Sequence, residues 1–451
     1  MLIDDPALGN GETPDRLAFV NARLVDPATG LDEQGGLLVA NGKIADIGRH
    51  IHGEAGGDAV IVDCGGNVLA PGLIDMMVFT GEPGHEHRGT LSDTSRAAAA
   101  GGVTSILCMP DTDPVIDDVA LVDFLLRRAR DTAAVHVHPL AAMTKGLRGE
   151  EMTEIGLLKS AGAIAASNGK RSLANAKVMR NVLAYAKDFD ILVMHAIEEP
   201  TLAEGGVMNS GEVSMRLGLK GVPAAAETIM LERDLRLVEM TEARYHAAEI
   251  SCRASLEIVR AAKEKGLPVT CGVSINHLAL NENDIGPYRT FFKMRPPLRA
   301  EEDRQAMVEG LASGDIDVIV SAHDPQDADV KRHPFADAAY GAVGLETMLA
   351  VALRLHHNDG VPLTTLLRAM SANPAGILGL KGGRLAIGAP ADLVLIDLET
   401  PWVVDPEALR SKSKNTPFDQ ARLEGRPVAT LVAGRIVYNY GAKAFGGTQP
   451  G

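Results

Sequence analysis

The sequence lacks close cysteine pairs, long apolar runs and blocks of basic residues. Only 4 of its 451 residues are cysteine, and Cys64, Cys108, Cys252 and Cys271 form no CxxC pair, which excludes a cysteine-rich zinc site or a thioredoxin-type redox motif. No segment approaches the roughly 18 consecutive apolar residues of a transmembrane helix, and the acidic N-terminus has no apolar signal-peptide core. We therefore expect a cytoplasmic protein without a membrane span.

The chain also lacks a surplus of positive charge. Its formal net charge is −15 and it contains no run of Lys or Arg, so neither nucleic acid nor an anionic membrane is expected as its main partner. Hydrophobic residues make up 46% and charged residues 23% of the 451 positions, a balance typical of a globular protein with a substantial core. The length predicts one large domain and a smaller one.

The first strand-to-helix turn has no GxGxxG motif, which argues against a dinucleotide-binding open sheet. Instead, eight short apolar segments alternate with longer helix-like segments, and this alternation predicts an α/β fold with a closed (β/α)8 TIM-type barrel. The predicted strands are residues 73–79, 103–109, 135–142, 163–167, 190–197, 244–250, 267–273 and 316–322.

Both ends of the chain have a different pattern. Short apolar runs separated by Gly, Asn and Asp, as in hairpins, occupy residues 17–69, and β-like runs return near the C-terminus. We therefore predict a small composite β domain, formed by residues 1–69 and 386–451, beside a barrel formed by residues 70–385.

A series of motifs extends through almost the whole chain, from about residue 17 to residue 441. They include APGLIDM, EPGHEH, RAAAAGGVTSILCMPDTDPVID, GGVMNSGEVSMRLGL, PPLRAEEDRQAMVEGLASGDID, SANPAGILGL and GAPADLVLIDL. In order and spacing they resemble the long bacterial dihydroorotases of the amidohydrolase superfamily. The resemblance implies the same barrel and flanking β domain. It also implies reversible cyclisation of carbamoyl aspartate to dihydroorotate, in which zinc ions at the C-terminal barrel face generate hydroxide and polarise the amide.

The zinc ligands that the resemblance implies are missing from the first and fourth strands. Where the family has the two histidines of His-x-His, this chain has Met77 and Phe79. A thioether is a poor zinc ligand in an oxygen and imidazole site, and a phenyl ring is no ligand. The family's metal-bridging carboxylate corresponds to Asn168, whose amide cannot deprotonate.

The later strands have lost their ligands as well. The family histidines of strands five and six correspond to Ala196 and Glu249, and its proton-carrying Asp corresponds to Ala322, whereas His323 keeps its place. His195 and His246 are displaced from the ligand positions, and a one-residue shift on a strand turns a side chain to the opposite face. We therefore expect no metal and no cofactor, although zinc is usual in the family.

The positions that bind substrate in the family differ too. Gly81 stands where the family has an Arg that pairs with the substrate carboxylate, and Asp111 and Arg295 replace two Asn residues. Asp111 is expected to repel an anionic ligand, and the change to Gly81 removes a bidentate partner.

Three functions remain open on the sequence. The first is a non-catalytic, dihydroorotase-like structural partner of aspartate carbamoyltransferase, in a homo- or hetero-oligomer, a role implied by resemblance to companion chains without zinc ligands. The second is a dihydroorotase or hydantoinase-like hydrolase with a rebuilt site, for which His85, His87, His195, His246, Glu249, His323 and Asp324 are the available groups. The third is a regulatory protein that binds a metabolite in the altered pocket.

Overall fold

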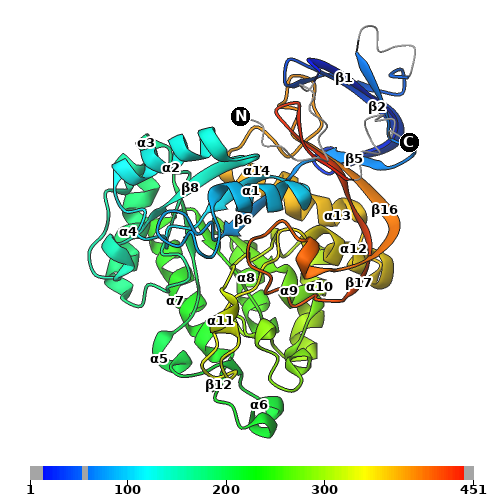
Figure 1. The fold of residues 1–451 in the computed structure, drawn as a ribbon. Helices are drawn as coiled ribbons and strands as arrows, with labels where there is room; N and C mark the ends of the chain where they lie inside the picture. The colour runs from blue at the N-terminus through cyan, green and yellow to red at the C-terminus, as the bar shows by residue number, and fades with distance from the viewer. Residues whose placement is uncertain (1–13, 53–58, 441–451) are drawn as a thin grey trace.

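A parallel barrel forms the centre of the molecule, as predicted (Figure 1). The computed structural model describes residues 14–52 and 59–440. The barrel strands are β6 (Leu73–Val78), β7 (Val103–Cys108), β8 (His136–Ala142), β9 (Ala165–Ser167), β10 (Leu192–His195), β13 (Tyr245–Ala247), β14 (Val269–Ser274) and β15 (Val318–Val320). They are paired in chain order, and a bridge between Val78 and His323 joins the first strand to the segment after the last.

The barrel strands are buried on both faces, which explains their apolar composition. Every residue of β6 and of β7 is buried, as in a parallel sheet whose outer face is covered by helices. A cluster that includes Leu107, Leu140, Met194 and Val320 packs together inside the barrel, so the interior is a filled core.

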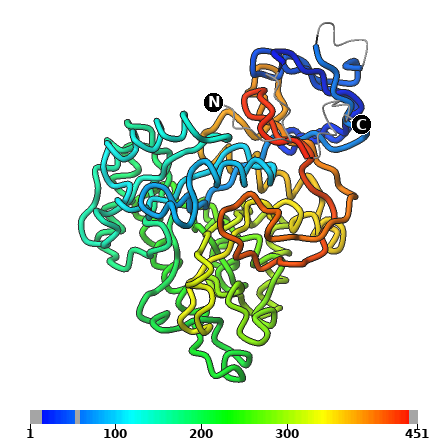
Figure 2. Tube along the Cα trace, in the orientation of Figure 1, coloured from blue at the N-terminus to red at the C-terminus, as the bar shows by residue number. Residues whose placement is uncertain are grey.

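Helices alternate with these strands along the chain and surround them (Figure 2). They are α1 (Leu91–Ala100), α2 (Val119–Thr132), α3 (Ile155–Ala161), α4 (Ala176–Asp188), α7 (Ala225–Thr241), α8 (Arg253–Glu264), α9 (Ile275–Ala279), α10 (Glu301–Ser313), α11 (Ala328–Lys331), α12 (Met348–Asp359), α13 (Leu363–Leu367) and α14 (Asn373–Leu378). In α4 the buried side chains are Met179, Val182, Leu183 and Ala186, a spacing that places them on one helix face. The Asn175 side chain caps the first turn of this helix.

A second sheet combines both ends of the described chain, as predicted. Its strands are β1 (Arg16–Asp26), β2 (Leu31–Ala40), β3 (Lys43–Gly48), β4 (Val60–Asp63), β5 (Val68–Pro71), β16 (Leu393–Val403), β17 (Arg422–Val432) and β18 (Arg435–Asn439). β16 pairs with β5 and thereby joins the two ends. β16 and β17 extend along the barrel, where β17 contacts α12 (Figure 1). The predicted domain also included residues 1–13, 53–58 and 441–451, which lie outside the described residues.

An arm between β10 and α7 was not predicted from the sequence. It contains α5 (Pro200–Ala203), β11 (Met208–Asn209), α6 (Glu212–Leu217) and β12 (Gly221–Val222). The arm extends away from the flanking sheet to the far end of the molecule, with α6 at its tip (Figure 1). Its elements are too short for a periodic pattern to identify them.

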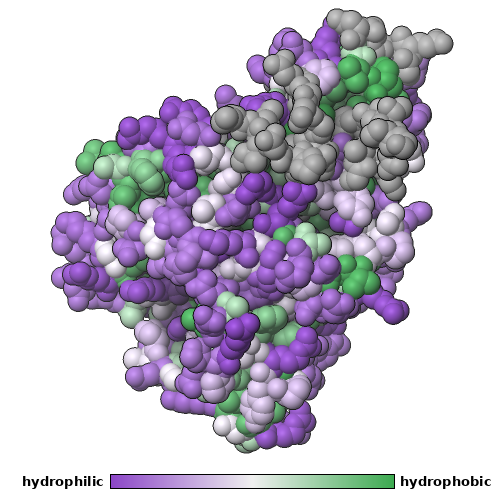
Figure 3. Space-filling view, viewed as in Figure 1, coloured by the Kyte–Doolittle hydropathy of each residue, from purple (hydrophilic) through white to green (hydrophobic). Residues whose placement is uncertain are grey.

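The face of the molecule seen in Figure 3 is mostly hydrophilic, with hydrophobic residues in small separate groups. Small separate hydrophobic groups of this kind are common on the surfaces of globular proteins. Among the described residues, no helix is both long and apolar enough to span a membrane.

Candidate functional site

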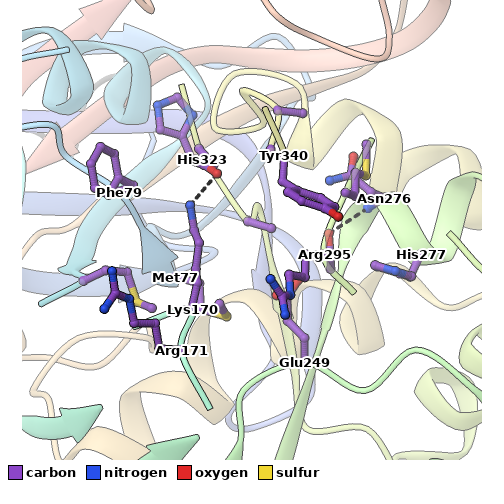
Figure 4. A pocket seen from close by; sticks show the side chains of 17 residues that line it. Met77, Phe79, Lys170, Arg171, Glu249, Asn276, His277, Arg295, His323 and Tyr340 are labelled. Atoms are coloured by element: carbon purple, nitrogen blue, oxygen red, sulfur yellow. Dashed lines mark hydrogen bonds and ion pairs between the residues drawn. The ribbon is translucent and has the colours of Figure 1, made fainter. Parts of the chain in front are cut away.

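A cavity of about 220 Å³ lies at the carboxyl ends of the barrel strands (Figure 4). This is the end at which barrel enzymes bind their substrates. Seven of the positions singled out in the sequence line it together, and they come from three strand ends and one loop. They are Met77, Phe79, Glu249, Arg295, Ala322, His323 and Asp324.

The remaining predicted positions lie around this cavity. Ala196 lines a smaller neighbouring cavity of about 30 Å³, which shares Met77, Lys170 and Glu249 with the larger one. Asn168 lines neither of the two, because its amide is bonded to Thr144, accepting from the backbone N–H at 3.1 Å and donating to Oγ1 at 2.9 Å.

Gly81 also lies outside both cavities. Its φ is 76°, and a Cβ on it would come within 2.2 Å of the Gly89 carbonyl oxygen. This turn therefore requires glycine, and an arginine at this position would need a different loop.

Phe79 forms the apolar part of the cavity wall together with Met77, Met109 and Met294. Its side chain is buried, and its ring lies 4.0 Å from the Arg88 guanidinium and 5.3 Å from the Lys170 ammonium group. The stacking of cations on an aromatic face is attractive because of the ring quadrupole.

Asp324 holds these two cations in place. Its Oδ1 accepts a hydrogen bond of 2.5 Å from Arg88 Nη2, and its Oδ2 forms an ion pair with Lys170 Nζ. The carboxylate itself is buried. Lys170 therefore lies among the strand ends as a fixed positive charge.

Glu249 is the one carboxyl group among the six former ligand and base positions. Burial raises its pKa to about 8, against an opposing effect of Lys170, so the group is mainly a neutral acid at pH 7. No hydrogen bond or ion pair of its carboxyl group is present within the described residues, although it lines both cavities. In this state Glu249 is a hydrogen-bond donor and a weak ligand.

His323 is held as a neutral ring. Its Nδ1 accepts a hydrogen bond from the Gly344 backbone N–H at 3.2 Å, and burial lowers its pKa to about 3. The ring proton is therefore on Nε2. The preceding Ala322 has φ 51°, a left-handed conformation that is unfavourable for alanine.

Asp111 differs from the expectation drawn from its sequence position. The residue is half-buried and does not line the cavity. Its Oδ1 has no hydrogen-bond partner within the described residues, and desolvation of the carboxyl group raises its pKa. Asp111 is therefore not part of the cavity wall.

His195 and His246 point away from the cavity, in agreement with their displaced register. His195 Nδ1 lies 2.6 Å from Asp234 Oδ2, and its Nε2 accepts from the Leu173 N–H at 2.7 Å. His246 Nδ1 lies 2.8 Å from the Thr270 hydroxyl. Both imidazoles are fully buried and serve the packing of the barrel.

Several polar lining residues were missed in the sequence. Lys170 and Arg171 lie in the turn after β9. The family pattern drew attention to this turn only through Asn168, which replaces the metal-bridging carboxylate. Asn276, His277 and Tyr340 lie in segments without a recognisable motif. These residues line the cavity: Lys170, Arg171, Asn276, His277 and Tyr340.

The donor set does not fit the zinc ions of the family. A structural or catalytic zinc needs at least three ligands from His, Cys, Asp or Glu. The strand ends provide Glu249, which is largely protonated, His323, whose Nδ1 is occupied, and Asp324, whose two oxygens pair with Arg88 and Lys170. In the described part of the chain, no group of three or more such residues could hold a metal ion.

Solved structures with this architecture include a hydantoinase and a dihydropyrimidinase. The L-hydantoinase (dihydropyrimidinase) from Arthrobacter aurescens superposes with a TM-score of 0.85 at 25% identity, covering 94% of this chain and 96% of that chain. The dihydropyrimidinase from Brevibacillus agri NCHU1002 shares the fold, with a TM-score of 0.81 at 20% identity and coverage of 94% and 95%. A model described as Amidohydrolase family matches residues 340–438. Fold and cavity position thus define an amidohydrolase-type barrel protein.

The sequence comparisons narrow this class. A model described as Dihydro-orotase-like matches residues 66–255. The chain is 42% identical over 426 residues to the dihydroorotase of Anaplasma phagocytophilum (strain HZ), covering 94% of this chain and 95% of that protein. It is 43% identical over 422 residues to the dihydroorotase of Pelobacter propionicus, with coverage of 94% and 99%. The chain belongs to the dihydroorotase family.

Proposed function

We propose that this chain is a non-catalytic dihydroorotase-like protein of pyrimidine biosynthesis that serves as a structural partner of an aspartate carbamoyltransferase. The observation that carries the proposal is the contrast between a preserved fold and a lost donor set. The barrel and the flanking sheet match the fold of a solved hydantoinase, whereas Met77, Phe79 and Ala322 stand where the family pattern has ligands and base.

The chemistry of amide hydrolysis supports the non-catalytic part of the proposal. Hydrolysis needs a nucleophilic hydroxide, a base that accepts its proton and a charge that stabilises the oxyanion. Glu249 is mainly protonated at neutral pH and His323 has a pKa of about 3, so neither accepts a proton readily there. Asp324 is a carboxylate, but it is engaged by Arg88 and Lys170.

The alternative is a cyclic-amide hydrolase with a rebuilt site. In its favour, the named relatives are dihydroorotases, and the cavity still contains Glu249, His323 and Asp324 beside two cations. A hydrolase of this kind would have to activate water without the family's metal.

Metal analysis and activity measured on one preparation distinguish the two functions. We expect substoichiometric zinc after purification in zinc-supplemented medium, and no hydrolysis of dihydroorotate or hydantoin above the uncatalysed rate. Turnover that survives chelator treatment would establish the rebuilt hydrolase. Stoichiometric zinc together with turnover would show that the donor set has been assigned wrongly.

A further inference from the structure

An ion pair joins opposite sides of the barrel at the carboxyl ends of its strands. Lys170, in the turn after β9, pairs through Nζ with Oδ2 of Asp324, which follows β15. The eight strands are paired in chain order, and the bridge between Val78 and His323 joins the first strand to the segment after the last. Counted around this ring, three strands separate β9 from β15 in either direction. The pair therefore spans the barrel from one side to the other.

The Lys170 side chain lies among the former ligand positions. It lines both cavities together with Met77 and Glu249, and its Nζ is 5.3 Å from the centre of the Phe79 ring. Burial raises the pKa of Glu249, and the Lys170 charge is the largest influence that opposes this rise, which requires the two groups to be close. One ammonium group is thus placed where the family pattern has several metal ligands.

The turn that carries Lys170 has a fixed shape. The Asn168 amide is bonded to Thr144 on both of its sides, and the Gly169 N–H donates to Ser167 Oγ at 3.1 Å. Gly169 has a φ of 65°, and a Cβ on it would come within 2.9 Å of Asp111 Cγ, so the turn requires glycine there.

The same turn carries the metal-bridging carboxylate in the family pattern, whereas here it has the neutral Asn168 followed by a cation. The charge that this turn brings to the strand ends has therefore changed from negative to positive.

Asp324 depends on the cations around it. Its side chain is only 6% exposed, and its two oxygens pair with Arg88 and Lys170. A buried carboxylate without such partners is costly, and removing one partner leaves part of this cost uncompensated. The Lys170 side chain itself is 35% exposed, so a small molecule from solvent can reach its place if the side chain is shortened.

We propose that the Lys170 ammonium is a built-in cation that takes the place of a bound metal ion at the strand ends and holds opposite sides of the barrel together through Asp324. A fixed positive charge in this place repels a divalent cation, which adds to the mismatch between the donor set and zinc. Lys170 is a positioning residue in this assignment, because it acts through Asp324. The assignment rests on the proposed non-catalytic function, since a metal ion and the ammonium group cannot share the strand ends.

Chemical rescue of Lys170→Ala tests the proposal. The change removes three carbon atoms and the ammonium group, which together have the size of a propylammonium ion. We expect the melting temperature to fall by several degrees, because Asp324 loses one of its two cations. Propylammonium chloride should recover about half of this loss or more, since a ligand that binds only the folded state stabilises it by mass action. 1-Propanol, which has the size without the charge, and sodium chloride at the same concentration should recover none of it.

Two controls show whether the rescue depends on charge and on Asp324. Lys177→Ala, an exposed change on α4, should leave the melting temperature unchanged with and without propylammonium. In the background of Asp324→Asn, Lys170→Ala should no longer respond to propylammonium. Lys170→Met keeps the length of the side chain and serves if Lys170→Ala does not fold. Its destabilising effect should largely disappear when Asp324→Asn is also present, because the two changes remove the same interaction.

Equal recovery by 1-propanol and propylammonium would show that the Lys170 stem acts by packing alone and would overturn the proposal. No recovery by either, or equal losses for Lys170→Met with and without Asp324→Asn, would also overturn it. The metal analysis of the wild type tests the proposed function separately. A zinc-free wild type whose variant is not rescued would refute the role of Lys170 and leave the non-catalytic function standing, whereas stoichiometric zinc in the wild type would contradict both.

Discussion

Glu249 is a buried acid whose raised pKa makes the stability of the folded chain depend on pH. Its pKa is raised to about 8 from the usual value of 4.5, so between these two values the folded state holds a proton that the unfolded state has released. Stability should therefore fall as the pH rises through this window. The full effect is at most roughly 5 kcal/mol, taking about 1.4 kcal/mol per unit.

Glu249→Gln should remove this slope, because an amide has the shape of the neutral acid without its proton. We expect the variant and the wild type to have similar melting temperatures near pH 4.5, and the advantage of the variant to grow up to about pH 8 and then level off. Thermal unfolding followed by circular dichroism across this range measures it. The exposed Glu232→Gln is the control and should leave the slope unchanged. Parallel curves for Glu249→Gln and wild type would contradict the assignment.

Ala322 retains an unfavourable backbone conformation at a position where the family has its base. An alanine at φ 51° bears the Cβ clash of the left-handed region, which glycine avoids. Ala322→Gly should therefore raise stability by ~0.5–1 kcal/mol after the entropic cost of glycine is subtracted. The midpoint of urea unfolding measures this gain. Ala166→Gly, within β9 and without a positive φ, should lower the midpoint, and equal losses for both variants would disprove strain at residue 322.

At the scale of the elements, strands could be predicted from the sequence better than the loops that follow them. Continuous apolar runs located all eight barrel strands, because each strand is buried on both faces. The positive charge of the cavity was not predicted. Lys170, Arg171 and Arg295 lie in loops, and their approach to one cavity depends on strand order and loop path, which no local pattern encodes.

Asp111 shows the same limit for a single side chain. Its position in the family pattern predicts a charge that faces a ligand, whereas in the fold the residue does not line the cavity. The arm around α6 was missed for a related reason, since two-residue strands and a helix of six residues leave no periodic signal.

In the family pattern, the two histidines at the first barrel strand bind zinc together with ligands from other strands, and the whole set acts as a unit. Met77→His with Phe79→His would restore one strand of donors, but Asn168, Ala196 and Ala322 would still offer none. We expect the double variant to show no measurable dihydroorotate turnover, since the effects of catalytic groups are strongly non-additive. Zinc content by atomic emission and a hydrolysis assay provide the two measurements.

A matched variant keeps this prediction informative. This variant carries Met77→His and Phe79→His and, in addition, the four other changes to the family residues. The four are Asn168→Asp, Ala196→His, Glu249→His and Ala322→Asp. Zinc retention is expected to rise only in this sixfold variant. Robust turnover in the double variant would show that the chain already holds the remaining ligands in another arrangement.

At the scale of the whole molecule, the folded frame does not depend on the lost site. The barrel core, the flanking sheet and their contact through β17 and α12 are formed mostly by buried apolar residues that do not line the cavity. A rigid surface of this size can be retained for assembly after its chemistry is lost, because interfaces and catalytic constellations use different residues. The partner role can therefore be tested by separating changes in the cavity from changes on the surface.

Phe79→Ala makes this separation for the proposed aspartate carbamoyltransferase partner. The ring is buried in the cavity wall, so its removal should cost roughly 3–5 kcal/mol of stability and yet leave the assembly intact, since the surface is unchanged. Charge reversals on the exposed face that contacts the transferase should have the opposite effect, dissociating the complex without unfolding the barrel. Co-expression with the transferase of the same organism, followed by size-exclusion chromatography with light scattering, measures both effects.

A single peak of combined mass is expected for wild type and for Phe79→Ala at temperatures where both are folded. Two separate peaks at micromolar concentration, with full transferase activity in the absence of this chain, would exclude the partner role.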